Sequence, residues 1–319
     1  MNRVKLIVNP NANLGRAVAG EAGLRSVAAE LGGGDWVGTV YPRHAVELAQ
    51  QAPEQGYELV VAVGGDGTVH EVINGLMRVP RPVRPRLGVV PFGSGNDFAH
   101  AIGMPDGAVP ALRQVYTGRP QRVDLGRLTI LDDAGAPRLT EYFDNTLGIG
   151  FDAAVVIRSR RMTWLRGMLV YLAAVLQTIA LDHVAPRLQV RTDSESWDQA
   201  SLMLVLCNGP REGGGFFIQP QARLDDGLLH YAGVGRISRL RMLRLLPEVL
   251  QGTHGRFREV RMGAFERLEL DSSLALTIHA DGEILAGPAN GGEPGQPAPL
   301  PDVRRLVVEA LRGEIEVIR

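Results

Sequence analysis

The first third of the sequence alternates short, continuous apolar runs with longer segments whose apolar residues recur at helical spacing. Short runs without polar alternation are typical of strands buried on both faces. Strands that alternate with helices predict a mostly parallel sheet with covering helices. The expected strands are Val4–Val8, Trp36–Tyr41, Leu59–Val63 and Leu87–Val90, and the expected helices are Arg16–Leu31, His44–Gln55 and Thr68–Met77.

The pattern changes beyond Arg119, where strand-like runs follow one another and only Trp164–Leu181 and Ser238–Gln251 have helical spacing. A chain of 319 residues has room for about two domains. We therefore predict an α/β fold class: an N-terminal, mostly parallel α/β domain over residues 1–120 and a β-rich, sandwich-like domain over residues 121–300. The last strands, near residues 303–319, can return to the first domain.

Composition excludes several classes of function. Lys and Arg number 34 and Asp and Glu 35, so the net charge of −1 disfavours a nucleic-acid partner. Lys5 is the only lysine, which excludes a Walker-A loop and a protein-kinase strand lysine. Cys207 is the sole cysteine, so no intrachain disulfide forms, and a reducing, cytoplasmic location is expected. The longest apolar stretch, Met168–Ala180, is shorter than the roughly 18–20 residues of a membrane span.

The strongest motif is Gly64-Gly65-Asp66-Gly67-Thr68, which follows a buried strand and opens a helix. Backbone N–H groups in a glycine-rich turn at a helix start form an anion site. Thr68 and Glu71 have capping-box spacing, which predicts Thr68 as the N-cap. Because a bare carboxylate repels phosphate, Asp66 indicates a cation between the two, most naturally Mg²⁺ carried with a nucleotide.

A second loop, Pro91–Phe98, follows the next strand and, like the first, is a glycine-containing turn that leads into a helix. Gly93 and Ser94 lie in the turn, Asn96 is an expected N-cap, and Asp97 is a second acid at a strand's carboxyl end. Loops at the ends of neighbouring strands can form one cleft.

Five further polar segments each fit a simple turn when taken alone. They are Asn9–Arg16, Asp124–Gly126, Asn145–Asp152, Leu224–Leu228 and Ala280–Glu283.

Taken together and in order, these motifs resemble the diacylglycerol kinase catalytic-domain family, which includes soluble bacterial lipid kinases and sphingosine kinases. The match includes Gly64–Thr68 and Pro91–Phe98, and continues with Asp225–Leu228 and Asp281–Glu283. The resemblance implies transfer of the γ-phosphate of ATP to a lipid hydroxyl by an α/β nucleotide domain and a β-sandwich domain.

The resemblance also implies roles for individual residues. Asp66, Asp97 and Asp124 would organise a magnesium and water network, and Glu283 would be the general base, with Asp281 as the competing candidate. A structural Mg²⁺ would bind Asp226 and the backbone carbonyls of Arg223 and Leu228. The positions expected to bind the nucleotide are Asn9, Thr39, Gly64, Gly65, Asp66, Gly67, Thr68, Glu71, Gly93, Ser94, Asn96 and Asp97.

Two alternatives stay open at this point: an NAD kinase, which shares the first loop, and a lipid-carrying regulatory module that binds nucleotide without turnover. The expected partners are ATP and a lipid at a membrane surface, and the resemblance allows a homodimer. Arg158, Arg160, Arg161 and Arg166 precede an apolar helix, so they are either a solvated basic face or a membrane-docking cluster.

Overall fold

The computed structural model describes residues 3–10, 12, 16–162, 168–292 and 296–319, and the chain divides into two compact units. Unit 1 comprises residues 1–123 and 313–319, and unit 2 comprises residues 124–312. Both boundaries fall within long strands that contribute residues to each unit, β5 (Pro120–Leu131) and β15 (Arg305–Ile318).

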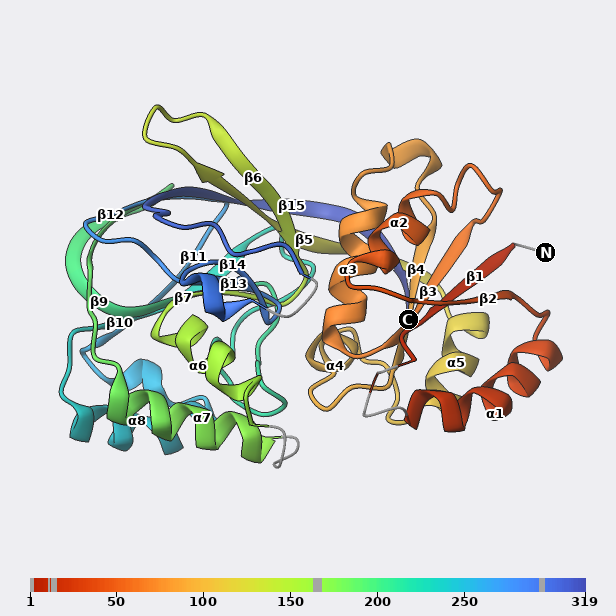
Figure 1. Ribbon diagram of the computed structural model, residues 1–319, viewed down its shortest axis with the longest axis horizontal. Coiled ribbons are helices and arrows are strands. Elements are labelled where there is room, and N and C mark those ends of the chain that lie inside the picture. The colour runs from red at the N-terminus through yellow and green to blue at the C-terminus, as the bar shows by residue number, and fades with distance from the viewer. Residues whose placement is uncertain (1–2, 11, 13–15, 163–167, 293–295) are drawn as a thin grey trace. The chain divides into compact units, whose positions relative to one another are not determined.

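Unit 1 is a parallel sheet with helices (Figure 1). Its other strands are β1 (Val4–Val8), β2 (Asp35–Gly38), β3 (Leu59–Gly64) and β4 (Arg86–Pro91). Its helices are α1 (Arg16–Glu30), α2 (His44–Gln50), α3 (Asp66–Leu76), α4 (Asp97–Ala101) and α5 (Ala108–Thr117), with a short 3₁₀ turn η1 (Arg81–Val83).

The strand order in unit 1 is β4-β3-β1-β2, with every pair parallel, and the end of β15 joins β4 through Val317 and Leu87. All residues of β1 and β3 are buried, as the continuous apolar runs predicted. Because the strands are parallel, the loops that follow them leave from one edge of the sheet. The predicted α/β fold class is thereby confirmed.

Unit 2 is dominated by antiparallel strands. They are β6 (Pro137–Phe143), β7 (Thr146–Gly150), β8 (Arg187–Thr192), β9 (Ser196–Cys207), β10 (Leu229–Gly235), β11 (Val260–Phe265), β12 (Arg267–Ser272), β13 (Ile278–Ala280) and β14 (Glu283–Ala286). Its helices are α6 (Phe151–Ser159), α7 (Met168–Leu181) and α8 (Arg239–Gln251), with 3₁₀ turns η2 (His254–Arg256) and η3 (Ala289–Gly291).

Strand β9 organises unit 2 because its two halves pair with different strands. Its first half pairs with β8, and its second half pairs with β7 and β10. One apolar core contains residues from both groups, including Val190 of β8 and Tyr231 of β10. Strand β8 alternates exposed and buried residues, as a strand with one face on a core must.

Several sequence-based boundaries were wrong. The run Tyr142–Gly148 was expected to be one strand but divides into β6 and β7, whereas the two strands expected near the C-terminus are the single strand β15. No helix was expected at Phe151–Ser159, which forms α6 with several residues buried by tertiary packing. The start of the predicted helix Trp164–Leu181 lies outside the described residues.

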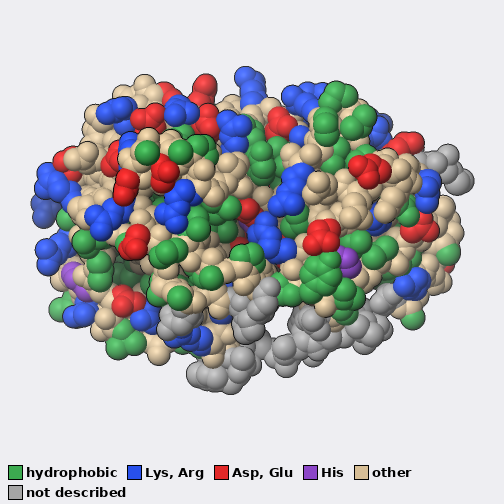
Figure 2. Space-filling view, turned by 45° about the horizontal axis from the view of Figure 1, so that its top comes forward, with side chains coloured by type: hydrophobic (Ala, Val, Ile, Leu, Met, Phe, Trp, Pro, Cys, Tyr) green, Lys and Arg blue, Asp and Glu red, His purple; other side chains and the backbone are tan. Residues whose placement is uncertain are grey.

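On the face displayed in Figure 2, basic and acidic side chains are interspersed, as a net charge of −1 leads one to expect. None of the helices among the described residues is long and apolar enough to cross a membrane.

Candidate functional site

The two glycine-rich loops meet at the carboxyl edge of the unit 1 sheet. Strands β3 and β4 pair in parallel up to Gly64 and Pro91, and the Phe92 N–H then donates to the Gly64 carbonyl at 2.7 Å. A Cβ on Gly93 would lie 2.6 Å from the Gly65 Cα, so the two backbones approach more closely than side chains would allow. The expected pairing of the loops is therefore present in the structure.

The Asp66 carboxylate links the first loop to the second. Its two oxygens accept the N–H groups of Asn96 and Asp97, each at 2.8 Å. Asp66 thus acts on the start of α4, where a negative charge also interacts favourably with the helix dipole. The structure gives this carboxylate a supporting role that the phosphate-repulsion argument did not foresee.

Asn96 stabilises the second loop through its own side chain. Its Oδ1 accepts the Gly93 N–H at 2.8 Å, and its Nδ2 donates to the Gly93 carbonyl at 2.9 Å. The residue has a left-handed backbone (φ 51°), which asparagine tolerates better than most residues. Asn96 occupies the N-cap position of α4, as predicted, but its side chain makes no cap hydrogen bond to the helix.

The predicted capping box at Thr68 and Glu71 is wrong. The N-cap of α3 is Gly65, and Thr68 is buried in the first turn, where its Oγ1 accepts a hydrogen bond from Asn9 Nδ2 at 3.3 Å. The Glu71 carboxylate instead accepts the N–H groups of Arg43 and Ala45, at 2.9 and 3.2 Å. A sequence-local rule failed here because Glu71 serves the start of a neighbouring helix, α2.

The remaining predicted nucleotide residues of unit 1 lie at the same edge of the sheet. Asn9 follows β1 and its N–H donates to the Val63 carbonyl, whereas the N–H of Thr39, beyond β2, donates to the Val8 carbonyl. Ser94 is exposed in the loop after β4, and the Asp97 side chain is buried at the start of α4. Open α/β sheets bind their ligands at this edge.

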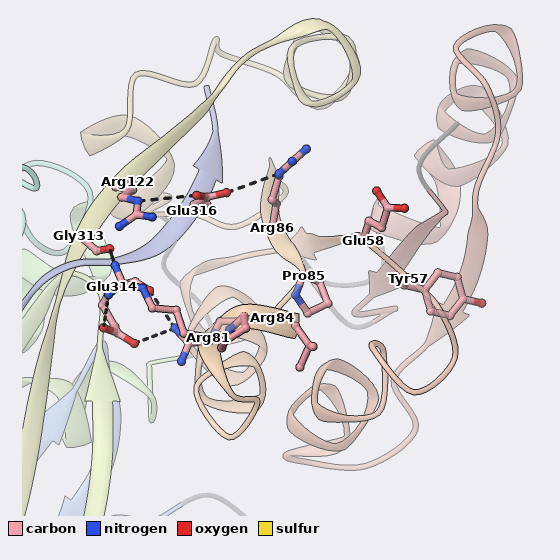
Figure 3. Close-up of a pocket in the computed structure, with 12 residues that line it drawn as sticks. Tyr57, Glu58, Arg81, Arg84, Pro85, Arg86, Arg122, Gly313, Glu314 and Glu316 are labelled. Carbon is pink, nitrogen blue, oxygen red and sulfur yellow. Dashed lines mark hydrogen bonds and ion pairs between the residues drawn. The ribbon is translucent and has the colours of Figure 1, made fainter.

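A second pocket of unit 1, of about 380 Å³, lies at the opposite strand ends (Figure 3). Glu58 precedes β3 and Arg86 opens β4, so the pocket is at the amino ends of these strands. Its charges largely pair with one another: Arg84 with Glu314 at 2.9 Å, and Arg86 with Glu316 at 3.5 Å. The arginines and glutamates of this pocket are therefore largely neutralised by one another.

Asp124 and Asp226 belong to one hydrogen-bonded turn of unit 2. The buried Asp124 carboxylate accepts the Gly227 N–H at 2.6 Å, and the Asp124 N–H donates to the Leu224 carbonyl at 2.7 Å. Gly227 has a φ of 80°, a conformation that favours glycine. Asp124 therefore braces the Arg223–Leu228 turn.

The Asp226 carboxylate does not fit the expected structural metal as the turn stands. Its Oδ1 accepts the Leu228 N–H at 3.0 Å, and its Oδ2 lies 3.0 Å from His230 Nε2. Both oxygens thus have nitrogen donors from the chain, and a cation would have to compete with the His230 ring.

Asp281 and Glu283, the two candidate bases, differ in their surroundings. The Asp281 carboxylate accepts three backbone N–H groups, from Asp144, Asn145 and Thr146, at 2.9–3.0 Å. Glu283 is half-buried, and its Oε2 lies 2.9 Å from an Arg160 guanidinium nitrogen. Asp281 therefore holds the start of β7, whereas Glu283 presents its carboxylate from the start of β14.

A buried polar cluster of unit 2 was not found from the sequence. His279 Nε2 lies 2.8 Å from Asp152 and 3.4 Å from Glu212, and the Tyr171 hydroxyl lies within hydrogen-bond distance of both carboxylates, at 3.1 and 3.0 Å, with one proton to donate to either. Gly148 is required beside them, because a Cβ there would lie 1.9 Å from Asp152 Oδ2. The four polar residues come from four distant segments, so no local spacing marks them.

The protonation of this cluster follows from its contacts. Burial acts to lower the pKa of His279, but the Glu212 and Asp152 carboxylates outweigh it and raise that pKa. His279 Nδ1 accepts the Gly282 N–H at 3.1 Å, which places the ring proton of the neutral form on Nε2, toward Asp152. Burial and the two carboxylates raise the pKa of Tyr171 well above its usual value, so its hydroxyl stays a donor.

Two residues of the cluster, Asp152 and Tyr171, also line an apolar cavity of about 90 Å³. Asp152, Tyr171 and His254 are its titratable lining residues, and the rest of the lining is apolar, from α6, α7, β9, β10, α8 and neighbouring segments. The volume of the cavity is below the roughly 300–1,000 Å³ of typical ligand pockets, so it has room for only a small apolar group beside Asp152 and Tyr171.

We expect Asp66→Asn to weaken the junction of the two loops, because the amide has only one oxygen to accept two backbone N–H groups. The stability of the fold should fall by about 1–3 kcal/mol, and ATP affinity should fall with it. Urea unfolding and calorimetric ATP titration measure both effects. The exposed Asp106→Asn is the matched control; unchanged stability and ATP affinity in Asp66→Asn would refute the supporting role.

We expect Mg²⁺ to leave the melting temperature of the nucleotide-free protein almost unchanged. His230→Ala removes the ring that competes for Asp226, so this variant should become stabilised by millimolar Mg²⁺. Thermal unfolding with Mg²⁺ or EDTA makes the comparison. Stabilisation of the wild type that disappears in Asp226→Asn would show that a metal binds there despite His230.

Comparison with known proteins agrees with this geometry. The chain matches the diacylglycerol kinase catalytic domain over residues 3–128 and the YegS C-terminal NAD kinase beta sandwich-like domain over residues 145–299. A crystal structure titled as a diacylglycerol kinase from Bacillus anthracis has the same fold, with a TM-score of 0.70 and 18% identity, covering 99% of this chain and 96% of that one.

Two curated relatives extend the comparison. A probable lipid kinase YegS-like protein of Chromohalobacter salexigens is 35% identical over 242 residues, which cover 75% of this chain and 73% of the relative. A diacylglycerol kinase of Mycobacterium tuberculosis is 29% identical over 292 residues, 89% of each chain. On these matches, the chain belongs to the diacylglycerol kinase catalytic-domain family of lipid kinases.

Proposed function

We propose that this protein transfers the γ-phosphate of ATP to a hydroxyl group of a lipid such as diacylglycerol or a sphingosine-like base. The observation that carries the proposal is the paired loop edge of unit 1, where the absence of a Cβ at Gly65 and Gly93 lets the backbones of the two loops come into contact. Backbone N–H groups of such an edge bind phosphate at the start of α3. The apolar cavity beneath α7 and α8 supports the lipid part of the proposal.

The nucleotide half of the reaction depends on positioning and charge neutralisation, as phosphoryl transfer generally does. Gly64, Gly65, Gly67 and Gly93 would surround the phosphates. Mg²⁺, when bound with ATP, would neutralise charge on the phosphates, and we assign Asp97 to that network, with Asp66 holding Asp97 in place. Asp124 stays a proposed member of the network, although its carboxylate also braces the Arg223–Leu228 turn.

For the acceptor half, we assign the general base to Glu283. The Arg160 pair orients its carboxylate through Oε2, which leaves Oε1 to accept the proton of the lipid hydroxyl. Asp281 is a positioning residue, because its oxygens are engaged by three backbone N–H groups. The Asp152–Tyr171 end of the cavity offers hydrogen bonds to the polar part of the lipid.

A lipid substrate implies work at a membrane surface from the cytoplasmic side. Two members of the basic cluster expected to dock there have partners inside unit 2: Arg158 pairs with Asp182, and Arg160 with Glu283. Arg166 lies outside the described residues. These ion pairs therefore make Arg158 and Arg160 less suitable for binding an anionic membrane than the sequence suggested.

The direct test is a panel of acceptors incubated with γ-labelled ATP and Mg²⁺. Diacylglycerol, a sphingosine-like base, phosphatidylglycerol, an isoprenoid alcohol and NAD are compared for product that carries the label. We expect a labelled lipid. Labelled NAD would favour the NAD kinase alternative, and ATP binding with no labelled product from any acceptor would favour a module without turnover.

We expect Glu283→Gln to lower the single-turnover rate roughly 10²–10⁴-fold, the usual effect of losing a general base, with little change in ATP affinity or melting temperature. Asp281→Asn should lower the melting temperature, because the amide keeps only one oxygen to accept three backbone N–H groups. Single-turnover assays at saturating ATP compare the two variants. Loss of the chemical step in a stably folded Asp281→Asn, but not in Glu283→Gln, would transfer the base to Asp281.

A further inference from the structure

Helix α7 exposes an apolar face although it carries no charged residue along its fourteen positions. Its inward residues, including Ala174 and Val175, are buried against unit 2, whereas Leu169 and Leu181 are 58% and 63% exposed. A helix that is apolar on both faces is normally covered on both, so the outer face of α7 lacks the polar residues expected of a solvated surface.

Helix α8 extends the same surface. Leu240 is 80% exposed and Leu243 is 42% exposed, and their i, i+3 spacing places them together. Met242 and Leu245 point the other way and join the core cluster that also contains Val175 of α7. Both helices lie on the same side of the strands, as Figure 1 shows, and they contact each other, so we consider their outer sides together as one surface.

This surface concentrates the exposed apolar side chains of the described chain. Of the thirteen large hydrophobic residues that are exposed, six lie on these two helices, and a seventh, Phe217, lies beside α8, since its N–H donates to the Val249 carbonyl. Contiguous apolar surface of this kind marks a site of interaction, whereas isolated exposed leucines do not. The seven residues are Met168, Leu169, Leu176, Leu181, Phe217, Leu240 and Leu243.

The charge of the surface selects the kind of partner. The residues of α7 and the segment 236–251 contain four arginines and one glutamate, a net charge of +3 in a chain whose total is −1. Arg236, Arg239 and Arg244 are exposed, while Arg241 pairs with Glu259. An apolar face with arginines at its margin complements a bilayer that contains anionic lipid.

We propose that the outer faces of α7 and α8 dock this protein on an anionic bilayer, with Leu240 and Leu243 inserted among the lipids. The role that we give to this docking, which is to bring the enzyme to its lipid substrate, rests on the proposed lipid kinase function. The apolar cavity lies directly beneath the same helices, since Tyr171 and Ile179 of α7 and Leu245 of α8 line it. A lipid that leaves the bilayer would then have a short apolar path to the Asp152–Tyr171 end of the cavity.

Co-sedimentation with vesicles tests the proposal on the full chain. Vesicles of phosphatidylcholine alone are compared with vesicles containing 30% phosphatidylglycerol, at low and at high salt. The wild type should bind the anionic vesicles in a salt-sensitive manner. Leu240→Ser/Leu243→Ser should weaken that binding by roughly tenfold or more, whereas Val109→Ser/Leu274→Ser, which removes exposed apolar side chains elsewhere, should not.

Two results would overturn the proposal. One is unchanged vesicle binding by a folded Leu240→Ser/Leu243→Ser variant. The other is a wild type that does not bind vesicles but forms a dimer that this variant dissociates, which would make the face an interface between copies of the chain.

Kinase activity separates this proposal from the proposed function. On a detergent-dispersed short-chain lipid, the variant should match the wild type. Salt-sensitive vesicle binding by a wild type that phosphorylates no lipid would refute the function and leave the docking surface intact.

Discussion

The edge of unit 1 where the two glycine-rich loops meet depends on one carboxylate placed between those loops. Asp66 opens α3 after the first glycine-rich turn, and its oxygens accept the N–H groups that open α4 after the second. The contact requires the loops to come together, which the absence of side chains at Gly65 and Gly93 permits. The hydrogen bonds that Asp66 accepts from the second loop therefore give a structural reason for a carboxylate in the first glycine-rich loop, in addition to any role in metal binding.

Unit 2 uses carboxylates in the same way but for different segments. Asp124 holds the Arg223–Leu228 turn, and Asp281 holds the start of β7. Charge-assisted bonds from backbone N–H groups are stronger than neutral ones, and a buried carboxylate without such donors would be strongly destabilising. The aspartates of these motifs therefore stabilise the structure, in addition to any contribution to catalysis. When a variant of one of them loses activity, its stability has to be measured as well.

The sequence predicted the fold class and the pairing of the glycine-rich loops because both depend on local patterns: buried apolar runs, helical spacing and glycine at strand ends. It failed where partners are distant in the chain. Glu71 caps α2 instead of its own helix, and the His279–Asp152 contact joins residues 127 positions apart. The outer face of α7 was read only as an apolar segment, because exposure depends on which neighbours the fold supplies.

The central claim is that the two glycine-rich loops of unit 1 act as a single nucleotide site. Hydrogen–deuterium exchange of the backbone amides, with and without ATP and Mg²⁺, tests it most directly. The account predicts that the segments around Gly65–Thr68 and Gly93–Asp97 become protected together at the same ATP concentration. Protection of only one loop, or protection confined to the Arg81–Arg86 pocket at the opposite strand ends, would contradict it.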